Sequence, residues 1–199
     1  MSGRRTLVVT AIAVVVLLFG AATLWQSGRP EDRYAHVLLL DPRTGETLHR
    51  QILDGGYAVP ALLSGGRVAV ATLDSCPDGK GGSVTVFDET LERVLQTREL
   101  APCTVARLSS GGLRKLLGDS PGAAPVATSS ATTQTLAGGT LVQDADGIVP
   151  LALNRLTAYD ASGRVVWKRT SFDNPIGAAD ARDGRVAVAE QGEFTPGLE

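Results

Sequence analysis

The sequence predicts an all-β domain preceded by a single membrane-spanning helix. The main observation is a motif that occurs three times, in which an apolar strand ends in Asp and is followed by a short turn and a second strand. The copies read HVLLLDPRTGETLHRQIL over residues 36–53, SVTVFDETLERVLQTREL over 83–100 and RLTAYDASGRVVWKRTSF over 155–172. Each copy is typical of a β-hairpin. Because an internal repeat determines architecture, three such hairpins predict an array of similar β-sheets.

The spacing of the repeats predicts how many strands each sheet holds. A glycine turn followed by an alternating strand also recurs, at residues 65–71, 138–142 and 183–189. Gly139 and Gly184 are 45 positions apart, and the hairpin residues Asp41 and Asp88 are 47 apart. A period near this value matches one four-stranded blade of a β-propeller. We therefore expect a partial or small β-propeller of about three four-stranded blades, with an irregular β-sandwich of the same hairpins as the alternative.

The first hairpin is expected to lie in the middle of this array. Residues 37–40 read VLLL, so the strand is apolar on both of its faces. A strand with this pattern is typically covered on both sides, and we expect it to be central in a stack of sheets. Closed propellers have about 4–8 blades. Three blades therefore imply either a partial propeller or pairing with another chain, because an open sheet edge is an aggregation hazard.

The N-terminal region has the pattern of a membrane anchor. Residues 6–25 read TLVVTAIAVVVLLFGAATLW and carry no charge. A helix of this length rises about 30 Å, which is the thickness of the hydrocarbon core of a bilayer. Arg4 and Arg5 precede it, and Trp25 ends it where an interfacial aromatic residue is expected. We interpret residues 1–5 as a cytoplasmic head, 6–25 as a signal anchor and 26–35 as a polar linker.

The alternative for this region is a signal peptide cleaved near residues 20–22, where small residues occur. The flanking charges do not decide the orientation, because Arg29 and Arg33 follow the apolar run. A short basic head normally stays in the cytoplasm, and a large domain can cross a membrane regardless of its flanking charges. We expect a single-pass protein of the cell membrane whose C-terminal domain, residues 36–199, lies outside the cytoplasm.

The two cysteines agree with an oxidising compartment. Cys76 and Cys103 are the only cysteines in the chain, and an even number favours a disulfide there. In the chain-entropy model a bond closing a loop of this size is worth about 3–4 kcal/mol. Two buried free thiols and a reactive pair are the alternatives. A redox-active pair would normally have C-x-x-C spacing.

The long interval between the second and third hairpins predicts an insertion. Residues 118–135 read GDSPGAAPVATSSATTQT, a composition that is too poor in large apolar residues to build a core. We expect a flexible loop, with a partner-contacting loop or a glycosylated segment as alternatives. The flanking residues 110–117, SGGLRKLL, fit a strand or a short helix equally well.

These hairpins resemble the pyrroloquinoline-quinone-like (quinoprotein-type) β-propeller repeat family. In that family a blade carries a strand, then Asp, two residues, Thr-Gly, and a Trp a few positions later. The matching residues are Asp160, Gly163 and Trp167 in the third copy, Asp41 and Gly45 in the first, and Asp88 alone in the second. The resemblance implies the propeller fold but little about activity, because many members bind no quinone. We interpret Asp as a turn cap, Gly as a residue that allows positive φ, and Trp as packing between blades.

The sequence predicts no catalytic, cofactor-binding or metal-binding residues and no cofactor. The chain has 19 basic and 21 acidic residues, so it has no basic excess for binding nucleic acid. It contains no G-x-S-x-G nucleophile motif, phosphate loop or dinucleotide fingerprint. His36 and His49 are the only histidines, which disfavours a metal centre or a catalytic triad. Residues 144–147, DADG, match half of a calcium loop, and we interpret them as a turn.

The expected function is therefore protein interaction or scaffolding by a membrane-anchored, extracytoplasmic, β-propeller-like domain. The expected partners are the membrane, through residues 6–25, and another protein or further blades. Enzymatic activity is not expected, although the absence of motifs does not exclude it. The alternatives are a quinoprotein-type dehydrogenase or small-molecule sensor, in a truncated or split propeller, and a truncated gene product with no independent role.

Overall fold

A computed structural model describes residues 33–73, 82–101, 104–120, 122, 125–127, 131–144, 155–170 and 176–193. The chain divides into two compact units, 1–31 and 32–199, and all described residues belong to the second. The described residues form three antiparallel β-sheets, one short α-helix and two 3-10 helices. The prediction of an all-β fold is therefore confirmed. These sheets do not form a closed propeller ring.

Sheet B is a meander in which neighbouring strands follow each other along the chain. Its strands are β3 (Tyr57–Leu62), β4 (Val68–Leu73), β5 (Gly82–Phe87) and β6 (Val94–Leu100), in that order. All side chains of β4 are buried, whereas those of β6 are exposed except at its last residue. Burial therefore decreases from the interior strands to the outermost strand, as expected for a sheet with one edge in solvent.

Sheet C repeats this meander and adds a short fifth strand. Its strands are β7 (Val126–Ala127), β8 (Ala131–Leu136), β9 (Gly139–Asp144), β10 (Arg155–Asp160) and β11 (Val165–Thr170). The expectation of a flexible insertion over residues 118–135 is thus wrong for β7 and β8. Thr residues favour strands, and the Gln134 side chain bonds to the backbone of Ala179 and Ala181 in another sheet. Tertiary contacts therefore stabilise a segment whose composition suggests a loop.

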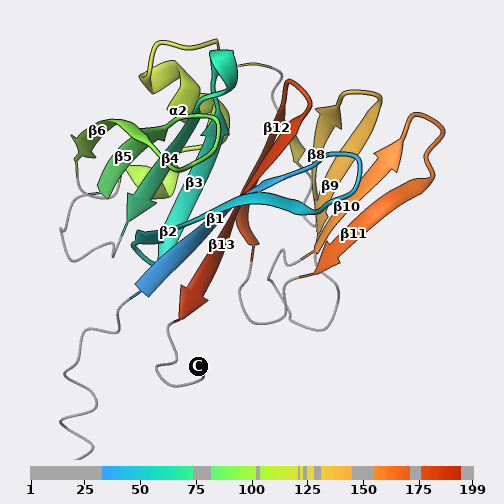
Figure 1. Cartoon of the computed structure of the whole chain (residues 1–199), viewed down its shortest axis with the longest axis horizontal. Helices are drawn as coiled ribbons and strands as arrows, with labels where there is room; N and C mark the ends of the chain where they lie inside the picture. Colours follow the sequence, from blue (N-terminus) through green and yellow to red (C-terminus); the bar gives the residue numbers. More distant parts are fainter. Residues whose placement is uncertain are drawn as a thin grey trace, which may run out of the picture. The chain divides into compact units, whose positions relative to one another are not determined.

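Sheet A joins the two ends of the described chain. Its order is β12 (Ile176–Arg182), β13 (Arg185–Glu193), β1 (Arg33–Leu40) and β2 (Thr47–Asp54). β1 pairs with β13 from Arg33 opposite Glu193 to Leu40 opposite Val186. Figure 1 shows this pairing as the blue strand beside the red one. The last two strands therefore complete a four-stranded sheet with the first hairpin, and residues 33–35 belong to β1 rather than to the expected linker.

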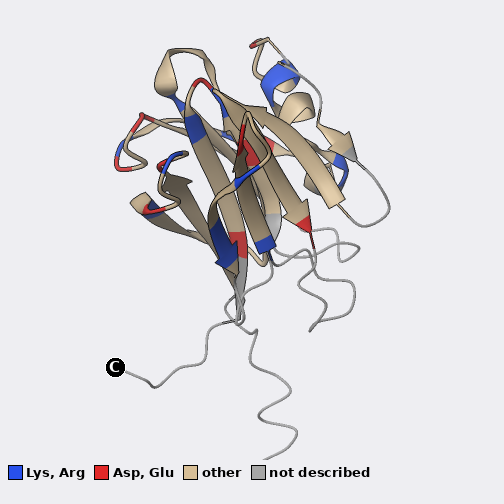
Figure 2. Cartoon of the chain, turned by 90° about the vertical axis from the view of Figure 1, so that its right-hand side faces the viewer, with Lys and Arg blue, Asp and Glu red and all other residues tan. Residues whose placement is uncertain are grey.

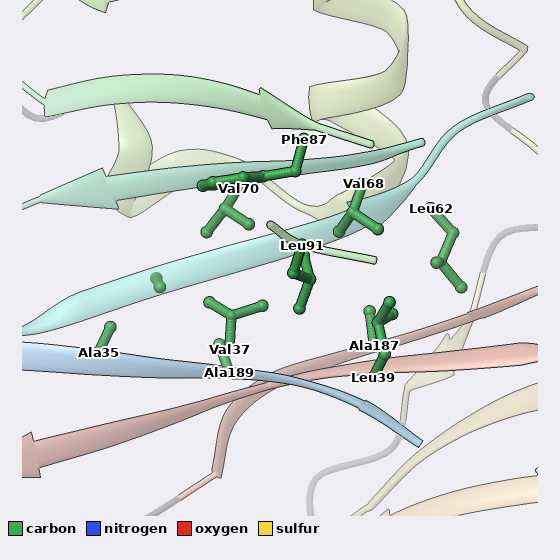
Figure 3. Close-up of a cluster of buried hydrophobic side chains, with 11 residues drawn as sticks. Ala35, Val37, Leu39, Leu62, Val68, Val70, Phe87, Leu91, Ala187 and Ala189 are labelled. Atoms are coloured by element: carbon green, nitrogen blue, oxygen red, sulfur yellow. The ribbon is translucent and has the colours of Figure 1, made fainter. Parts of the chain in front are cut away.

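β1 is buried on both faces, as predicted for a central strand. Val37 and Leu39 pack in a core cluster with sheet B, whereas Leu38 and Leu40 pack in a second cluster with sheet C. Figure 3 shows the first cluster, with side chains from both sheets pointing toward one another. Sheet A therefore lies between sheets B and C, and its two faces supply most of the apolar contacts that hold the sheets together.

The face of sheet B that does not contact sheet A is covered by helices. Val105 in the 3-10 helix η2 (Val105–Arg107) and Leu113 in α2 (Ser110–Leu116) are fully buried in a third cluster with strands of sheet B. The hydroxyl of Ser109 caps α2 by accepting a hydrogen bond from Gly112 N, 3.1 Å away. Of the two possibilities left open for residues 110–117, the helix is therefore the one that forms.

The predicted anchor lies outside the described residues. No helix in the described part of the chain is long and apolar enough to cross a membrane, and residues 6–25 are not among those described. Cys76 and Cys103 also lie outside them, so the disulfide remains a prediction.

Candidate functional site

The three Asp residues of the repeat cap the hairpin turns. Each carboxylate Oδ1 accepts a hydrogen bond from the backbone amide two residues later: 2.7 Å from Arg43 N to Asp41, 3.1 Å from Thr90 N to Asp88, and 2.9 Å from Ser162 N to Asp160. The hydrogen bond from the Ser162 hydroxyl, followed by that from Arg164 N, lowers the pKa of Asp160 below its usual value. All these contacts lie within the turns, as the structural interpretation of the Asp residues requires.

A residue with positive φ follows each Asp. Gly45 has φ +74° and Gly163 has φ +80°, and each donates its N–H to the carbonyl of its repeat Asp. Leu91 occupies this position in the copy that has no Gly, with φ +62°. Left-handed backbone costs an L-residue about 1–2 kcal/mol, whereas complete burial of a Leu side chain gains about 1.5–3 kcal/mol. Leu91 is only 1% exposed and points into the cluster between sheets A and B (Figure 3), so its burial offsets the cost.

Trp167 joins sheet C to the first turn of sheet A. Its indole Nε1 donates a hydrogen bond to the carbonyl of Pro42 over 2.8 Å. A Cβ built on Gly45 would lie 2.7 Å from Cδ2 of the same ring, which is closer than real Cβ contacts allow. The ring therefore lies directly against Gly45, and only glycine fits there. The Trp167 side chain therefore packs between sheets C and A.

The other two hairpins have no Trp, Tyr or Phe at the position of Trp167. Trp167 is opposite Ala158 in the strand register, two residues before Asp160. The corresponding pairs are Leu39 with His49 in sheet A and Val86 with Gln96 in sheet B. Among these three hairpins, only that of sheet C therefore carries a Trp at this position.

Each sheet has two distinct faces, which the repeat defines. The front face, as we define it, carries the residues one and three positions before the repeat Asp. The back face carries those two and four positions before it. The front-face residue Phe87 of sheet B clusters with the back-face residues Val37 and Leu39 of sheet A. The front-face residues of sheet A, Leu38 and Leu40, cluster with the back face of sheet C. Both interfaces thus join a front face to a back face.

The front face of sheet C has no such neighbour among the described residues. Its residues Thr157 and Tyr159 belong to none of the three apolar clusters. A Cβ built on Gly163 would meet no atom within 4 Å, in contrast to the Trp167 ring that covers the equivalent Gly45. The described part of the chain therefore covers the front faces of sheets A and B and leaves that of sheet C without a partner sheet.

This front face is mainly uncharged. The residues that share it by register are Val126, Ala131, Thr133, Thr135, Thr140, Val142, Asp144, Arg155, Thr157, Tyr159, Val165, Lys168 and Thr170. Arg155 and Asp144 form a two-pronged ion pair of 2.7 and 2.8 Å, so their charges cancel. Figure 2 shows long uncharged stretches along the strands, with charged residues gathered at turns and strand ends. Most of the side chains are half-buried, although Thr157 is 2% exposed.

A buried ion pair links α2 to β12 and β3, the first strands of sheets A and B. Arg114 of α2 lies 2.6 Å from Oδ2 of Asp180, and both side chains are less than 5% exposed. The same carboxylate oxygen accepts a hydrogen bond from Leu62 N over 2.7 Å. These bonds satisfy a buried charge and fix the helix against the sheets, which makes the pair a structural feature.

A second polar group includes Arg182, which lines a cavity of about 290 Å³ at the turns of sheets A and B. Asp119 accepts hydrogen bonds from the Ser64 hydroxyl and amide, and it pairs with Arg182. Partial burial raises the pKa of Asp119, but the Ser64 bonds and Arg182 outweigh it and lower this pKa to about 2. Arg185, also in the lining, donates to the Gly66 carbonyl and pairs with Glu89. The charges therefore satisfy one another, and the Asp119 carboxylate, whose pKa is lowered to about 2, is a weak base for the adjacent Ser64 hydroxyl.

The two histidines lie on the neighbouring strands β1 and β2 of sheet A. His36 Nδ1 lies 2.7 Å from Arg50, and because a guanidinium can only donate, the ring accepts this hydrogen bond. Burial, followed by the charge of Arg50, lowers the pKa of His36 and favours the neutral ring. His49 lies in β2 and is half-buried. Within the described ranges, no three His, Cys, Asp or Glu residues are close enough together to hold a metal ion.

Comparison with known proteins identifies no relative. No family model matches the chain, and neither a curated protein nor a solved structure matches it significantly. The resemblance to the quinoprotein-type repeat therefore rests on the repeat residues alone.

Proposed function

We propose that this chain is a membrane-anchored, extracytoplasmic, β-propeller-like domain that binds another protein. The observation that carries the proposal is the front face of sheet C, which lacks a partner sheet among the described residues although sheets A and B both bury theirs. The face is broad, mainly uncharged and built on regular strands. Such a surface suits protein binding, because little charge has to be desolvated on contact.

The anchor and the location belong to the same proposal. They rest on the uncharged run 6–25 and on the basic residues that precede it. We interpret sheets B, C and A as three blades, the last assembled from both ends of the described chain. A blade-like stack places many loops on its rims and leaves sheet faces at its two ends, and in this chain helix α2 covers one of those ends.

Cross-linking in intact cells tests the proposed function. We expect a membrane-permeant cross-linker to join the full chain to one specific protein, and protease added outside the cell to digest residues 36–199. The interaction role would be contradicted if no specific cross-linked product formed while the chain was present in the membrane at its normal amount. Protection of the domain from the external protease would contradict the location.

A further inference from the structure

The interfaces between sheets A and B and between sheets A and C follow one rule. The same rule describes the surface that would pack on the front face of sheet C. In each interface the front face of one sheet packs on the back face of the next. At the interface of sheets A and C, the back face also contributes the Trp167 ring, which lies on Gly45 and donates to the Pro42 carbonyl. The front face therefore supplies a glycine and a carbonyl, and the back face supplies an aromatic donor.

Sheet C repeats the front-face half of this contact. Gly163 resembles Gly45 in its positive φ and in donating its N–H to the carbonyl of the repeat Asp, although it follows that Asp by three residues and Gly45 by four. Ala161 matches Pro42, since each directly follows the repeat Asp. The space beside Gly163 is open for at least 4 Å from the position of a Cβ, as far as the described residues show. The site for a ring is thus formed, but none of the described rings occupies it.

The described part of a second copy of this chain offers no free complementary surface. The back faces of sheets A and C are buried inside the chain, and that of sheet B is covered by Leu113 and Val105. Trp167 is already in contact with Gly45. No back face with a free ring is left among the described residues of either copy, and we therefore assign the missing sheet to a different protein.

We propose that the front face of sheet C docks the back face of a β-sheet in another protein, with an aromatic side chain of that sheet stacked on Gly163. This inference rests on the proposed function and specifies its surface and its partner. The partner presents aliphatic side chains to the Thr, Val and Tyr side chains of sheet C. It also carries a Trp or Tyr, whose N–H or O–H donates to the Ala161 carbonyl. The contact is mainly uncharged, because Arg155 and Asp144 neutralise each other, which leaves Lys168 as the one other charged residue among those that share this face by register.

The test is site-specific photo-cross-linking of the full chain in the cells that make it. A photoreactive amino acid replaces Thr140, which is opposite Tyr159 on the front face of sheet C. In a control it replaces Thr97, which is exposed on β6 of sheet B. We expect the Thr140 probe to capture another protein, and the cross-linked peptide to contain an aromatic residue in a strand.

A matched pair of glycine variants makes the test specific. Gly163→Ala places a Cβ where the ring is expected, whereas Gly184→Ala introduces the same left-handed strain in a turn of sheet A that also has open space. A steric clash of this kind should lower the cross-linking yield about tenfold for Gly163→Ala. Gly184→Ala should leave the yield unchanged, which also controls for folding and abundance.

The possible results separate the two proposals. Capture from Thr97 but not from Thr140, or an equal yield in Gly163→Ala, would overturn the docking surface while leaving the interaction role intact. A product of twice the mass of the chain from Thr140 would show that a second copy covers the face, and would overturn the inferred partner. The absence of capture from both positions would overturn the proposed function itself.

Discussion

The contact between Gly45 and Trp167 makes a quantitative prediction about how sheets A and C are held together. Gly45→Ala places a Cβ 2.7 Å from Cδ2 and 2.9 Å from Cε3 of the ring. Both ring atoms belong to a buried side chain that is only 8% exposed and is also fixed by its bond to Pro42. The ring therefore has little freedom to move away, and the contact has to open.

The expected cost has two parts. Left-handed backbone at φ +74° costs an Ala residue about 1–2 kcal/mol. Overpacking of a well-filled contact costs about 1–3 kcal/mol more. Gly45→Ala should therefore lower the free energy of unfolding by about 2–5 kcal/mol, a large share of the stability of a small domain.

Gly163→Ala is the matched control. Gly163 has φ +80° in the equivalent turn, but its Cβ would meet nothing within 4 Å. This variant should lose only the backbone part, about 1–2 kcal/mol. The difference between the two variants thus measures the ring contact alone.

The assay is denaturant unfolding of the purified chain followed by tryptophan fluorescence. Trp167 is one of only two tryptophans in the chain, the other being Trp25. In Gly45→Ala we also expect the emission to shift to longer wavelength, because the ring gains contact with water. Equal losses of stability in the two glycine variants would refute the reasoning, since the ring would then not be packed on Gly45.

Four further predictions concern other parts of the chain. Leu91→Ala should cost about 2–5 kcal/mol in denaturant unfolding because it empties a buried site, whereas Leu95→Ala, at a half-exposed site, should cost far less. Arg114→Ala leaves Asp180 buried without its partner and should cost about 3–5 kcal/mol; removal of the exposed Arg164 should cost at most about 1 kcal/mol, and similar values would contradict the buried pair. His36 has a lowered pKa in the folded protein, so the unfolded chain binds more protons just below pH 6.5. The melting temperature should then fall as the pH drops below 6.5 and should be independent of this group above it, and His36→Gln should remove that part of the slope. Pyrroloquinoline quinone with calcium should leave the melting temperature unchanged; a rise at saturating ligand would favour the quinoprotein alternative.

Local signals in the sequence are sufficient to predict the hairpins and their turns. The Asp residues bond to amides two positions away, and Gly45 and Gly163 adopt the positive φ that their turns require. These interactions involve neighbours in the chain, so their residue types are readable from a short window. The burial of β1 on both faces was equally readable, because every residue from Val37 to Leu40 is apolar.

The same reasoning failed where a distant partner decides the structure. Residues 131–136 resemble a loop in composition, yet they form β8, which pairs with β9 along its full length and bonds through Gln134 to β12. Leu91 gave no sign of a left-handed turn, since its burial against sheet A outweighs the backbone cost. Asp180 and Arg114 are 66 positions apart and had no motif to connect them.

The sequence by itself determined the repeated hairpins, the capped turns and the burial of β1 on both of its faces. The tertiary structure alone decided that β1 pairs with β13, that α2 covers the back face of sheet B, and that the front face of sheet C has no described partner. The physical reason is that periodicity records which faces of a strand are apolar, and turn residues record local backbone conformation. Neither periodicity nor turn residues record which sheet faces pack against each other. That packing depends on the shapes of surfaces that the whole chain brings together.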